Sequence, residues 1–480
     1  MIRAIFASEL VTPLISRYQV HHFHRRESAP TTTTHSALAL SKWNPFAIVA
    51  GRNAAVAVRS PRAPLEISEE IIDCVAAQID ETVWLPELDP WRRTLLSCAL
   101  VCRAWYHHSQ FYLRQFVELR DRNQVLALSK LVRDNPRLGR AVRFVAVSGG
   151  STKNIPHPIP HFGTFVPMLA GKLPNTHTLR LENAEWRIGS ISPDTIRYLA
   201  MFPSVTTLEL RGVTFATVSQ LAQLVSALPA LRSLKTDRTL CKQVHLDMPT
   251  RLPLNARELK DIDMWWNTAP AILEFCTCLS EAALLCTLAI CVDEYDALQN
   301  RGGRQTLINT SARSLKKLRF GFHTYGLGPE DVDCVAQHVN LSRLVTLEHL
   351  ILDSRSFLGA DHSWIPKVLA TVESEWIQRV DVCFIVGARL RLLNTMLISM
   401  ERLGFLARMD EMLARRPFAK LRPFSVYLTI DMSICAPDDN KLHINLEGEK
   451  WPAWDELVRR NMVKSNKRGI LCTRITRTAP

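Results

Sequence analysis

Residues 202–213 read FPSVTTLELRGV, and this stretch sets the pattern of most of the chain. Related stretches read LPNTHTLRLENA at residues 173–184 and LPALRSLKTDRT at residues 228–239. Each begins with an apolar residue and a proline, and each then alternates apolar and variable residues around a central leucine. Alternation with a period of two predicts a short strand with one buried face. The three stretches therefore predict equivalent strands in successive units.

The same apolar spacing recurs nine times between residues 142 and 382, at intervals of about 26 to 34 residues. Apolar residues at helical spacing occupy the intervals, as in residues 218–228. A unit of one strand and one helix cannot bury its apolar face alone, so such units must stack on one another. We therefore expect a curved stack of parallel strands over residues 121–390.

Ahead of the repeats, residues 63–120 have the apolar spacing of helices. Ile67, Ile71 and Val75 recur every four residues, which predicts an amphipathic helix. The next apolar segment, residues 94–105, is too apolar for a lone surface helix. Two alternatives are open for these helices. They either cap the repeats and bury their apolar residues internally, or they leave them uncovered as a docking surface.

The segment from Leu65 to Trp105 resembles a divergent F-box of the kind abundant in fungal genomes. The resemblance rests on ISEEIID at residues 67–73 and, more specifically, on LLSCALVCRAW at residues 95–105. The chain departs from the family pattern at Ser68 and Glu69, where the family has a proline. The resemblance implies contact with a Skp-type adaptor that belongs to a cullin ubiquitin ligase. The residues that it assigns to this contact are Ile67, Glu70, Ile71, Val75, Leu100, Val101, Cys102 and Trp105.

The repeats resemble the irregular leucine-rich repeats found behind F-boxes, although only Asn183 lies near the position of their usual turn asparagine. Together the resemblances imply an α/β protein, in which an N-terminal helical F-box-like module precedes a leucine-rich-repeat-like solenoid of strands and helices. If the strands line the concave face, their variable positions point away from the core. The mixed charges and tryptophans there suit protein recognition better than phosphate binding. The predicted target-binding residues are Arg180, Glu209, Arg211, Asp263, Trp265, Trp266, Arg319 and Asp353.

The distribution of charge argues against nucleic-acid binding by the folded body. The formal net charge is +13. Residues 1–64 hold eight Lys or Arg and two acids, and residues 459–480 hold seven Lys or Arg and no acid. The two ends account for the whole excess, so the part between them is neutral. It cannot supply the continuous basic groove that phosphate binding by a folded domain needs.

Metal binding and catalysis are not expected. The 12 cysteines are scattered and follow no secretory signal, which favours free thiols in a reducing compartment. Cys276, Cys278, Cys286 and Cys291 do not have the spacing of a zinc site. The sequence contains no phosphate loop and no hydrolase or metalloprotease motif. We therefore expect no cofactor and no enzymatic activity, and no apolar run is long enough for a membrane span.

These observations divide the chain into five parts: a flexible basic leader (1–62), the F-box-like module (63–120), the solenoid (121–390), a C-terminal cap (391–458) and a basic tail (459–480). We expect a cytoplasmic or nuclear adaptor that recruits an unknown target protein to a Skp/cullin-type ubiquitin ligase. The alternative is a ligase-independent interaction scaffold whose basic ends touch nucleic acid or an organelle surface. The leader also has the composition of an organellar transit peptide, so its role stays open.

Overall fold

The computed structural model describes most of the chain from residue 65 onward. The described ranges are 65–79, 90–150, 155–242, 253–266, 268–293, 301–324, 339–356, 362–387, 390–433 and 451–476. The chain forms two compact units. Unit 1 comprises Met1–Ile79 and Trp91–Gln110, and unit 2 comprises Asp80–Pro90 and Phe111–Pro480. The expected leader, residues 1–62, lies outside the described residues.

The described part of unit 1 is built from helices. They are α3 (Leu65–Ala77), α4 (Pro90–Val101) and the greater part of α5 (Arg103–Leu113). The buried side chains lie on one face of each helix, with Ile72 on α3 and Leu95 and Ala99 on α4. His108 Nε2 of α5 lies 2.6 Å from Asp73 Oδ1 of α3. Short helices of this kind enclose only a small core, so much of their apolar surface stays uncovered.

Unit 2 is organised around one long sheet, which has 12 strands within the described residues. Every neighbouring pair is parallel, and the strands follow one another in chain order. The strands are β1 (Phe116–Leu119), β2 (Phe144–Ser148), β4 (Thr178–Glu182), β6 (Thr207–Arg211), β8 (Ser233–Asp237), β10 (Asp261–Trp265), β11 (Thr287–Asp293), β12 (Lys317–Thr324), β13 (His349–Ser356), β14 (Arg379–Gly387), β15 (Val426–Ser433) and β16 (Leu471–Thr476). The nine strands that the apolar spacing predicts are β2, β4, β6, β8 and β10–β14, and all nine are confirmed.

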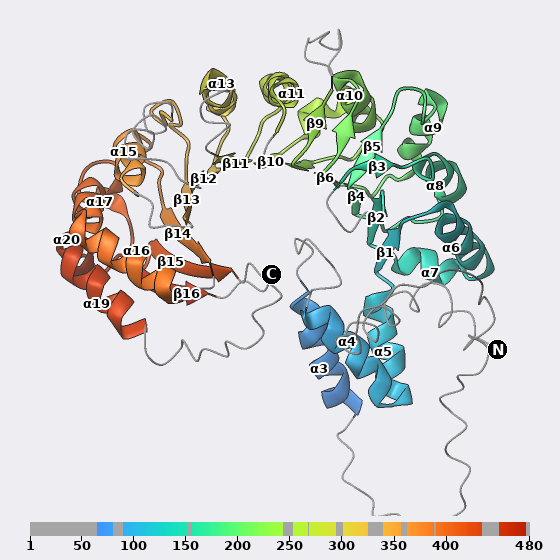
Figure 1. The fold of residues 1–480 in the computed structure, drawn as a ribbon, viewed down its shortest axis with the longest axis horizontal. Helices are drawn as coiled ribbons and strands as arrows, with labels where there is room; N and C mark the ends of the chain where they lie inside the picture. Colours follow the sequence, from blue (N-terminus) through green and yellow to red (C-terminus); the bar gives the residue numbers. More distant parts are fainter. Residues whose placement is uncertain are drawn as a thin grey trace, which may run out of the picture. The chain divides into compact units, whose positions relative to one another are not determined.

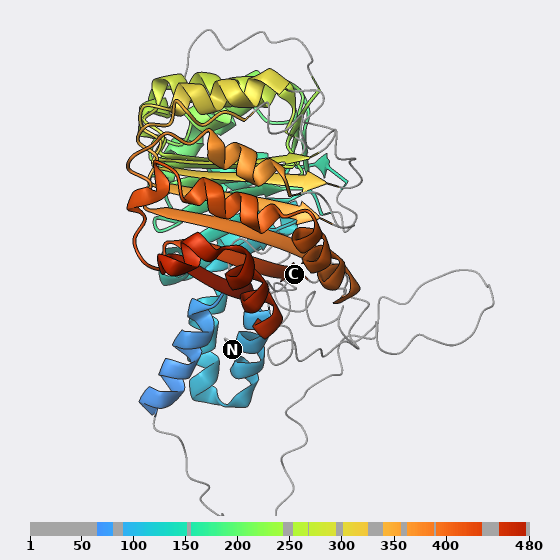
Figure 2. The same cartoon turned by 90° about the vertical axis from the view of Figure 1, so that its left-hand side faces the viewer.

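Helices pack on one face of this sheet, and the strands themselves form the opposite surface (Figure 1). The principal helices are α6 (Arg122–Asp134), α7 (Pro136–Ala141), α8 (Phe162–Leu169), α9 (Pro193–Arg197), α10 (Val218–Ser226), α11 (Pro270–Ala282), α13 (Arg301–Ser311), α15 (Trp364–Ala370), α16 (Leu390–Arg402), α17 (Phe405–Leu413), α19 (Trp451–Asn461) and α20 (Val463–Lys467). Turned by 90°, the helices stack in the same order as the strands (Figure 2). Unit 2 is thus a leucine-rich-repeat-like solenoid, and within the described residues every connection between successive strands of the long sheet, except that from β12 to β13, contains helical structure.

A continuous core lies between the sheet and the helices. Alternate strand residues such as Leu208 and Leu210 point into it and are fully buried. They pack with helix residues such as Leu221 and Phe165 in one cluster that runs from Leu119 to Ile470. Burial of each such side chain stabilises the fold by about 1.5–3 kcal/mol. The polar residues between them must then lie on the opposite face, which we call the inner face.

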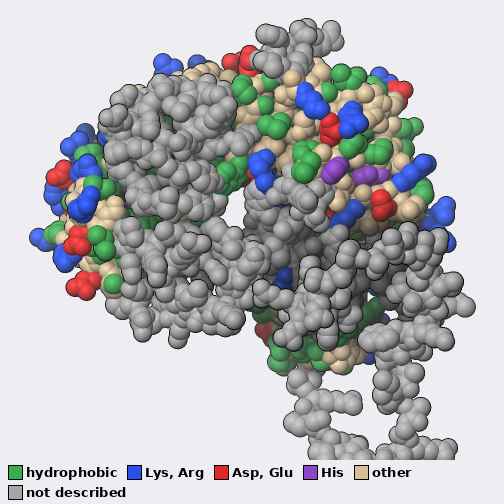
Figure 3. All heavy atoms as spheres, viewed as in Figure 1, with side chains coloured by type: hydrophobic (Ala, Val, Ile, Leu, Met, Phe, Trp, Pro, Cys, Tyr) green, Lys and Arg blue, Asp and Glu red, His purple; other side chains and the backbone are tan. Residues whose placement is uncertain are grey.

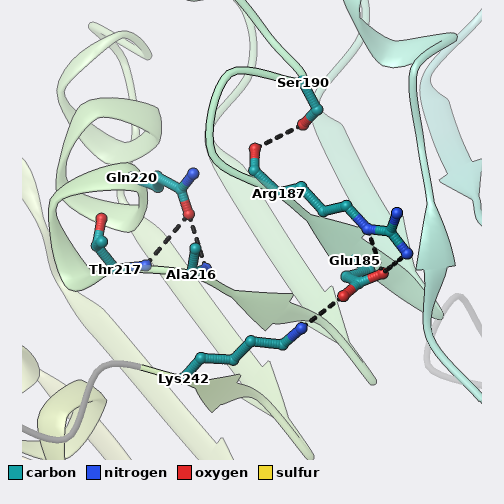
Figure 4. Close-up of polar contacts among 7 residues, drawn as sticks. All are labelled: Glu185, Arg187, Ser190, Ala216, Thr217, Gln220 and Lys242. Atoms are coloured by element: carbon teal, nitrogen blue, oxygen red, sulfur yellow. Dashed lines mark hydrogen bonds and ion pairs between the residues drawn. The ribbon is translucent and has the colours of Figure 1, made fainter.

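A second, smaller sheet follows the first in four of the repeats. Its strands are β3 (His157–Pro158), β5 (Ala184–Trp186), β7 (Thr214–Phe215) and β9 (Leu240–Cys241). A residue with positive φ, such as Asn183 or Gly212, turns the chain between the two sheets. At the surface of this sheet, Glu185 of β5 forms ion pairs with Arg187 at 2.8 Å and with Lys242 at 2.6 Å (Figure 4). The periodicity did not predict these strands, since two or three residues are too few to show a period.

The long sheet does not end at residue 390, where the sequence analysis placed the end of the solenoid. Strands β15 and β16 continue it in the same parallel register. The predicted basic tail is consequently corrected for residues 459–476, since they contribute α20 and β16. The alternation at Val426, Leu428 and Ile430 is visible in the sequence and predicts a strand. The spacing of these last strands is irregular, however, so the period did not identify them as further repeats. Asp410 binds the backbone N–H groups of Lys464 and Ser465 at 2.8 Å and so fixes α20.

Candidate protein-interaction site

Large apolar side chains are exposed on α3 and α4 of unit 1. Leu100 is 83% exposed and Val101 is 64% exposed, while Ile67 and Ile71 are each nearly half exposed. Ile67 and Ile71 lie one turn apart on α3 and share a face of that helix. Leu100 and Val101 form the end of α4. We call these four residues the helical apolar surface.

The other four predicted adaptor-binding residues are also accessible. Glu70 and Cys102 are exposed, and Val75 and Trp105 are half-buried. Cys102 lies between α4 and α5 because the segment 94–105 is interrupted there, so it does not share the buried face of Leu95 and Ala99. The capping alternative required internal burial of this set. Within unit 1, Leu100 and Val101 stay outside the buried core. Their role in binding stays a prediction.

The exposure of the helical apolar surface follows from the order of residues in the helices. On α4, Leu95, Cys98 and Ala99 occupy the buried face. Each residue of an α-helix is rotated by about 100° from the one before, so Leu100 and Val101 turn progressively away from that face. Covering an exposed leucine or valine completely is worth about 1.5–3 kcal/mol. The helical apolar surface therefore retains binding free energy that a partner could use.

On unit 2, the strand register gathers the predicted target-binding residues into rows on the inner face. One row runs through Arg180, Glu209, Lys235, Asp263, Ala289, Arg319, Ile351 and Asp381, each the register partner of the next. The row beside it contains Glu182, Arg211, Asp237 and Trp265, again as successive register partners. Trp266 follows β10 with a positive φ of 39°. The rows carry both signs of charge, and Figure 3 also shows Lys and Arg side chains interspersed with Asp and Glu over the described surface.

A buried ion-pair network occupies the inner face at β4, β6 and β8. Arg180 lies 2.7 Å from Glu209, and the two side chains are only 1% and 2% exposed. Lys235 binds the second oxygen of Glu209 at 3.0 Å, and Arg180 also stacks 4.5 Å above the Phe144 ring. Burial by itself raises the pKa of Glu209, but the charges of Arg180 and Lys235 outweigh it and lower that pKa below its ordinary value. Glu209 is therefore held as a carboxylate.

A second network spans β10 to β13 and presents an aromatic ring. Arg319 Nε lies 2.5 Å from Asp353 Oδ2, and the Arg319 guanidinium stacks 4.7 Å from the centre of a Trp265 ring. Asp353 is fully buried, whereas Arg319 is partly exposed. Small residues leave room for this arrangement, since a Cβ atom at Gly321 would lie 3.3 Å from Cys291 Sγ. The stacking holds Trp265 in a fixed position on the inner face.

Two acids that lie between these networks, Asp237 and Asp263, differ from Glu209 because their pKa values are raised. Burial raises the pKa of Asp237 to about 7, and the nearby Arg238 and Arg211 only partly oppose this shift. Burial likewise raises the pKa of Asp263 to about 6, although Lys235 and Arg319 lower it. Both side chains lie on the inner face beside Trp265.

The structure therefore sorts the predicted target-binding residues by accessibility. Arg180, Glu209 and Asp353 are buried and bind neighbouring side chains, so in this structure they support the inner face and are not open for direct contact. Arg211, Asp263, Trp265, Trp266 and Arg319 are half-buried, so part of the surface of each is exposed. Their contact with a target stays a prediction.

The sequence pattern placed some inner-face residues without distinguishing them, and it missed others. Asp237 stands in the second row, but only its burial shows that it differs from an ordinary surface acid. At the other end of the sheet, Arg379 and Arg474 both stack on Tyr427, at 4.1 and 4.4 Å. This cluster was missed because residues beyond 390 were assigned to a cap and a tail.

Of the cysteines flagged in the sequence, Cys291 lies on β11 beside Gly321. Cys276 is buried in α11, where burial raises the pKa of its thiol to about 12. Within the described residues, no group of three or more His, Cys, Asp or Glu side chains is placed to hold a metal ion. None of the described helices is both long and apolar enough to span a membrane.

The geometry defines the class of protein: a leucine-rich-repeat-like solenoid with an exposed apolar surface on a separate helical unit. No family model and no curated protein matches the sequence. Among solved structures, the chain is similar to one described as the crystal structure of the Rad7 and Elc1 complex in yeast. The TM-score is 0.30 and the identity is 11%, over 87% of this chain and 90% of that chain.

Proposed function

We propose that this chain is the target-recruiting subunit of a Skp/cullin-type ubiquitin ligase. The helical apolar surface binds the Skp-type adaptor, and the inner face of the solenoid binds the protein to be marked. The chain itself catalyses no step and acts by holding the target close to the ligase. Such a role belongs to the cytoplasm or the nucleus.

The observation that carries this proposal is the exposure of Leu100 and Val101 within a segment that resembles an F-box. Soluble proteins rarely leave neighbouring large apolar side chains uncovered unless they meet a partner. Tryptophan is a frequent anchor of protein interfaces, and Trp105 is half-buried close to this pair in sequence. The resemblance supplies the identity of the partner.

Co-purification with a purified Skp-type adaptor tests the proposal. The double variant Leu100→Asp, Val101→Asp should lose adaptor binding, because it places two charges in an apolar interface. Both side chains are exposed in the isolated chain, so the variant should fold, as thermal unfolding can verify. A matched control is Ile188→Asp, since Ile188 is 79% exposed but belongs to unit 2. Equal adaptor recovery from the native chain and the double variant would contradict the proposal.

The alternative, a ligase-independent scaffold whose basic ends bind nucleic acid or an organelle surface, has less support at the C-terminal end of the chain. There the cations are engaged within the fold: Arg459 lies 2.7 Å from Asp455, and Arg468 donates to the carbonyl oxygens of Leu413 and Phe418 at 2.7 and 2.6 Å. The N-terminal basic segment lies outside the described residues. The ligase-adaptor role therefore has the better support.

A further inference from the structure

Four side chains on two adjacent strands form one compact site on the inner face. Lys235 and Asp237 come from β8, and Asp263 and Trp265 come from β10. The register pairs Lys235 with Asp263 and Asp237 with Trp265, so the four occupy the corners of one square. We call this square the central site. It places two acids diagonally, next to an indole ring.

Asp237 is the unusual member of the central site. Its side chain is buried, with 6% exposure of the residue, yet neither carboxylate oxygen accepts a hydrogen bond from any residue that the structure describes. The nearest cation, Arg238 Nε, lies 3.8 Å away, which is too far for a hydrogen bond. Asp263 Oδ1 is likewise buried without a hydrogen bond. Buried carboxylate oxygens are normally paired, so this arrangement indicates that donors come from another molecule.

The two cations that act on Asp263, Lys235 and Arg319, are committed to other acids. Lys235 binds Glu209 at 3.0 Å, and Arg319 binds Asp353 at 2.5 Å. Moving either of them to Asp237 or Asp263 would leave Glu209 or Asp353 as a buried, unpaired charge, which is strongly unfavourable. Lys235 and Arg319 therefore cannot neutralise the central site without unbalancing a neighbouring pair.

We infer that the central site binds the basic side chain of a lysine or arginine in the recruited protein. An ammonium or guanidinium group there donates charge-assisted hydrogen bonds to Asp237 and Asp263, which are stronger than bonds between neutral groups. The indole of Trp265 adds attraction for a cation and an apolar surface for the aliphatic stem. This inference names the chemistry that the inner face recognises in the recruited protein. It rests on the proposed function only in treating that protein as the target of the ligase.

The binding should depend on pH in a defined direction. Asp237 has a pKa of about 7, raised by burial, so it gains its charge as the pH rises through neutrality. A basic side chain should then bind more tightly at about pH 8 than at about pH 6. The charged groups that act on Asp237 and Asp263 from the surrounding strands are Glu182, Glu209, Arg211, Lys235, Arg238 and Arg319.

The test uses the full chain and a fluorescein-labelled peptide of alternating arginine and serine, with binding followed by fluorescence anisotropy. The comparison peptide carries citrulline, a neutral counterpart, at every arginine. We expect the arginine peptide to bind at about pH 8, and the double variant Asp237→Asn, Asp263→Asn to weaken it at least about tenfold. The citrulline peptide should bind no better to the native chain than to the variant.

The matched control is Asp194→Asn with Glu375→Gln, which removes two acids from exposed ion pairs away from the central site. Its affinity for the arginine peptide should equal that of the native chain. Equal affinity of the native chain and the central-site variant would overturn the inference, and so would preferential binding of an alternating glutamate and serine peptide. Adaptor co-purification of the same variants keeps the two proposals apart, because the central site contributes no residue to the helical apolar surface.

Discussion

At the scale of single residues, the inner face holds buried charges of two opposite kinds. Glu209 is a paired charge, since two cations bind its two oxygens at 2.7 and 3.0 Å. Asp237 is a buried acid to which no side chain or backbone group in the described part of the chain donates a hydrogen bond. The first kind maintains the shape of the face. The second kind weakens the fold and is retained, in our interpretation, for binding.

Replacing Glu209 with Gln should destabilise the protein by about 3–5 kcal/mol, because it leaves Arg180 as a buried charge without its partner. Glu185→Gln is the matched control, as Glu185 also bridges two cations, but both of those cations are largely exposed. Its cost should be below about 1 kcal/mol. Denaturant unfolding measures the loss of unfolding free energy in both variants. Equal losses would show that burial does not make the ion pairs of Glu209 more important than those of Glu185.

Replacing Asp237 with Asn should stabilise the protein at neutral and higher pH. The folded-state pKa of about 7 lies above the unfolded value of 3.8, so the native chain loses stability as the pH rises between these values. The loss is on the order of 1.4 kcal/mol per unit of pKa shift, as an upper bound. Asn carries no such penalty, so its advantage should grow from about pH 4 to pH 7 and then stay constant. Unfolding curves at several pH values test this, and a destabilised variant at pH 8 would mean that Asp237 is a paired structural group.

At the scale of elements, strands with a clear apolar period were predictable and turns and short strands were not. All nine strands from β2 to β14 in the long sheet follow from alternation, as in Leu208 and Leu210, because one-sided burial imposes a period of two. The short strands of the second sheet carry too few residues for a period. The rows of the inner face also followed from the spacing, because parallel strands in register place equal positions side by side. Which members of a row are buried, as Arg180 is, depends on neighbouring strands and could not be predicted.

Helix α10 depends on a cap that single substitutions can remove. Thr217 and Gln220 form a reciprocal capping box, in which the Gln220 side chain accepts from the backbone N–H groups of Ala216 and Thr217 (Figure 4). Thr217→Ala should cost about 1 kcal/mol, since it leaves a helix N–H group without an acceptor. Thr217→Ser keeps the hydroxyl and should cost much less. Thermal unfolding compares them, and identical midpoints would show that the cap contributes nothing.

At the scale of the whole molecule, the long sheet of unit 2 runs from β1 to β16 within the described residues. A solenoid in which each repeat contacts only its neighbours depends on its terminal repeats to cover the core. Trp454, Val458 and Met462 are fully buried in this last section. Residues 459–476 of the expected basic tail are therefore part of the fold.

Deleting residues 459–480 should markedly lower the unfolding temperature or make the protein insoluble. The deletion removes β16, uncovers β15 as an edge strand and takes away the donors that bind the buried Asp410. The control is Lys464→Gln with Lys467→Gln in the full chain, which removes two exposed charges and keeps the strand. An unfolding midpoint equal to that of the full chain after the deletion would contradict this assignment.

The central claim is that the helical apolar surface is the docking site for a Skp-type adaptor. Hydrogen–deuterium exchange of the full chain with and without the adaptor tests it most directly. We predict slower exchange in residues 65–79 and 95–105 when the adaptor is present, and unchanged exchange in strands β4 to β14. Absence of protection in the two helical segments, or protection confined to the sheet, would contradict the account.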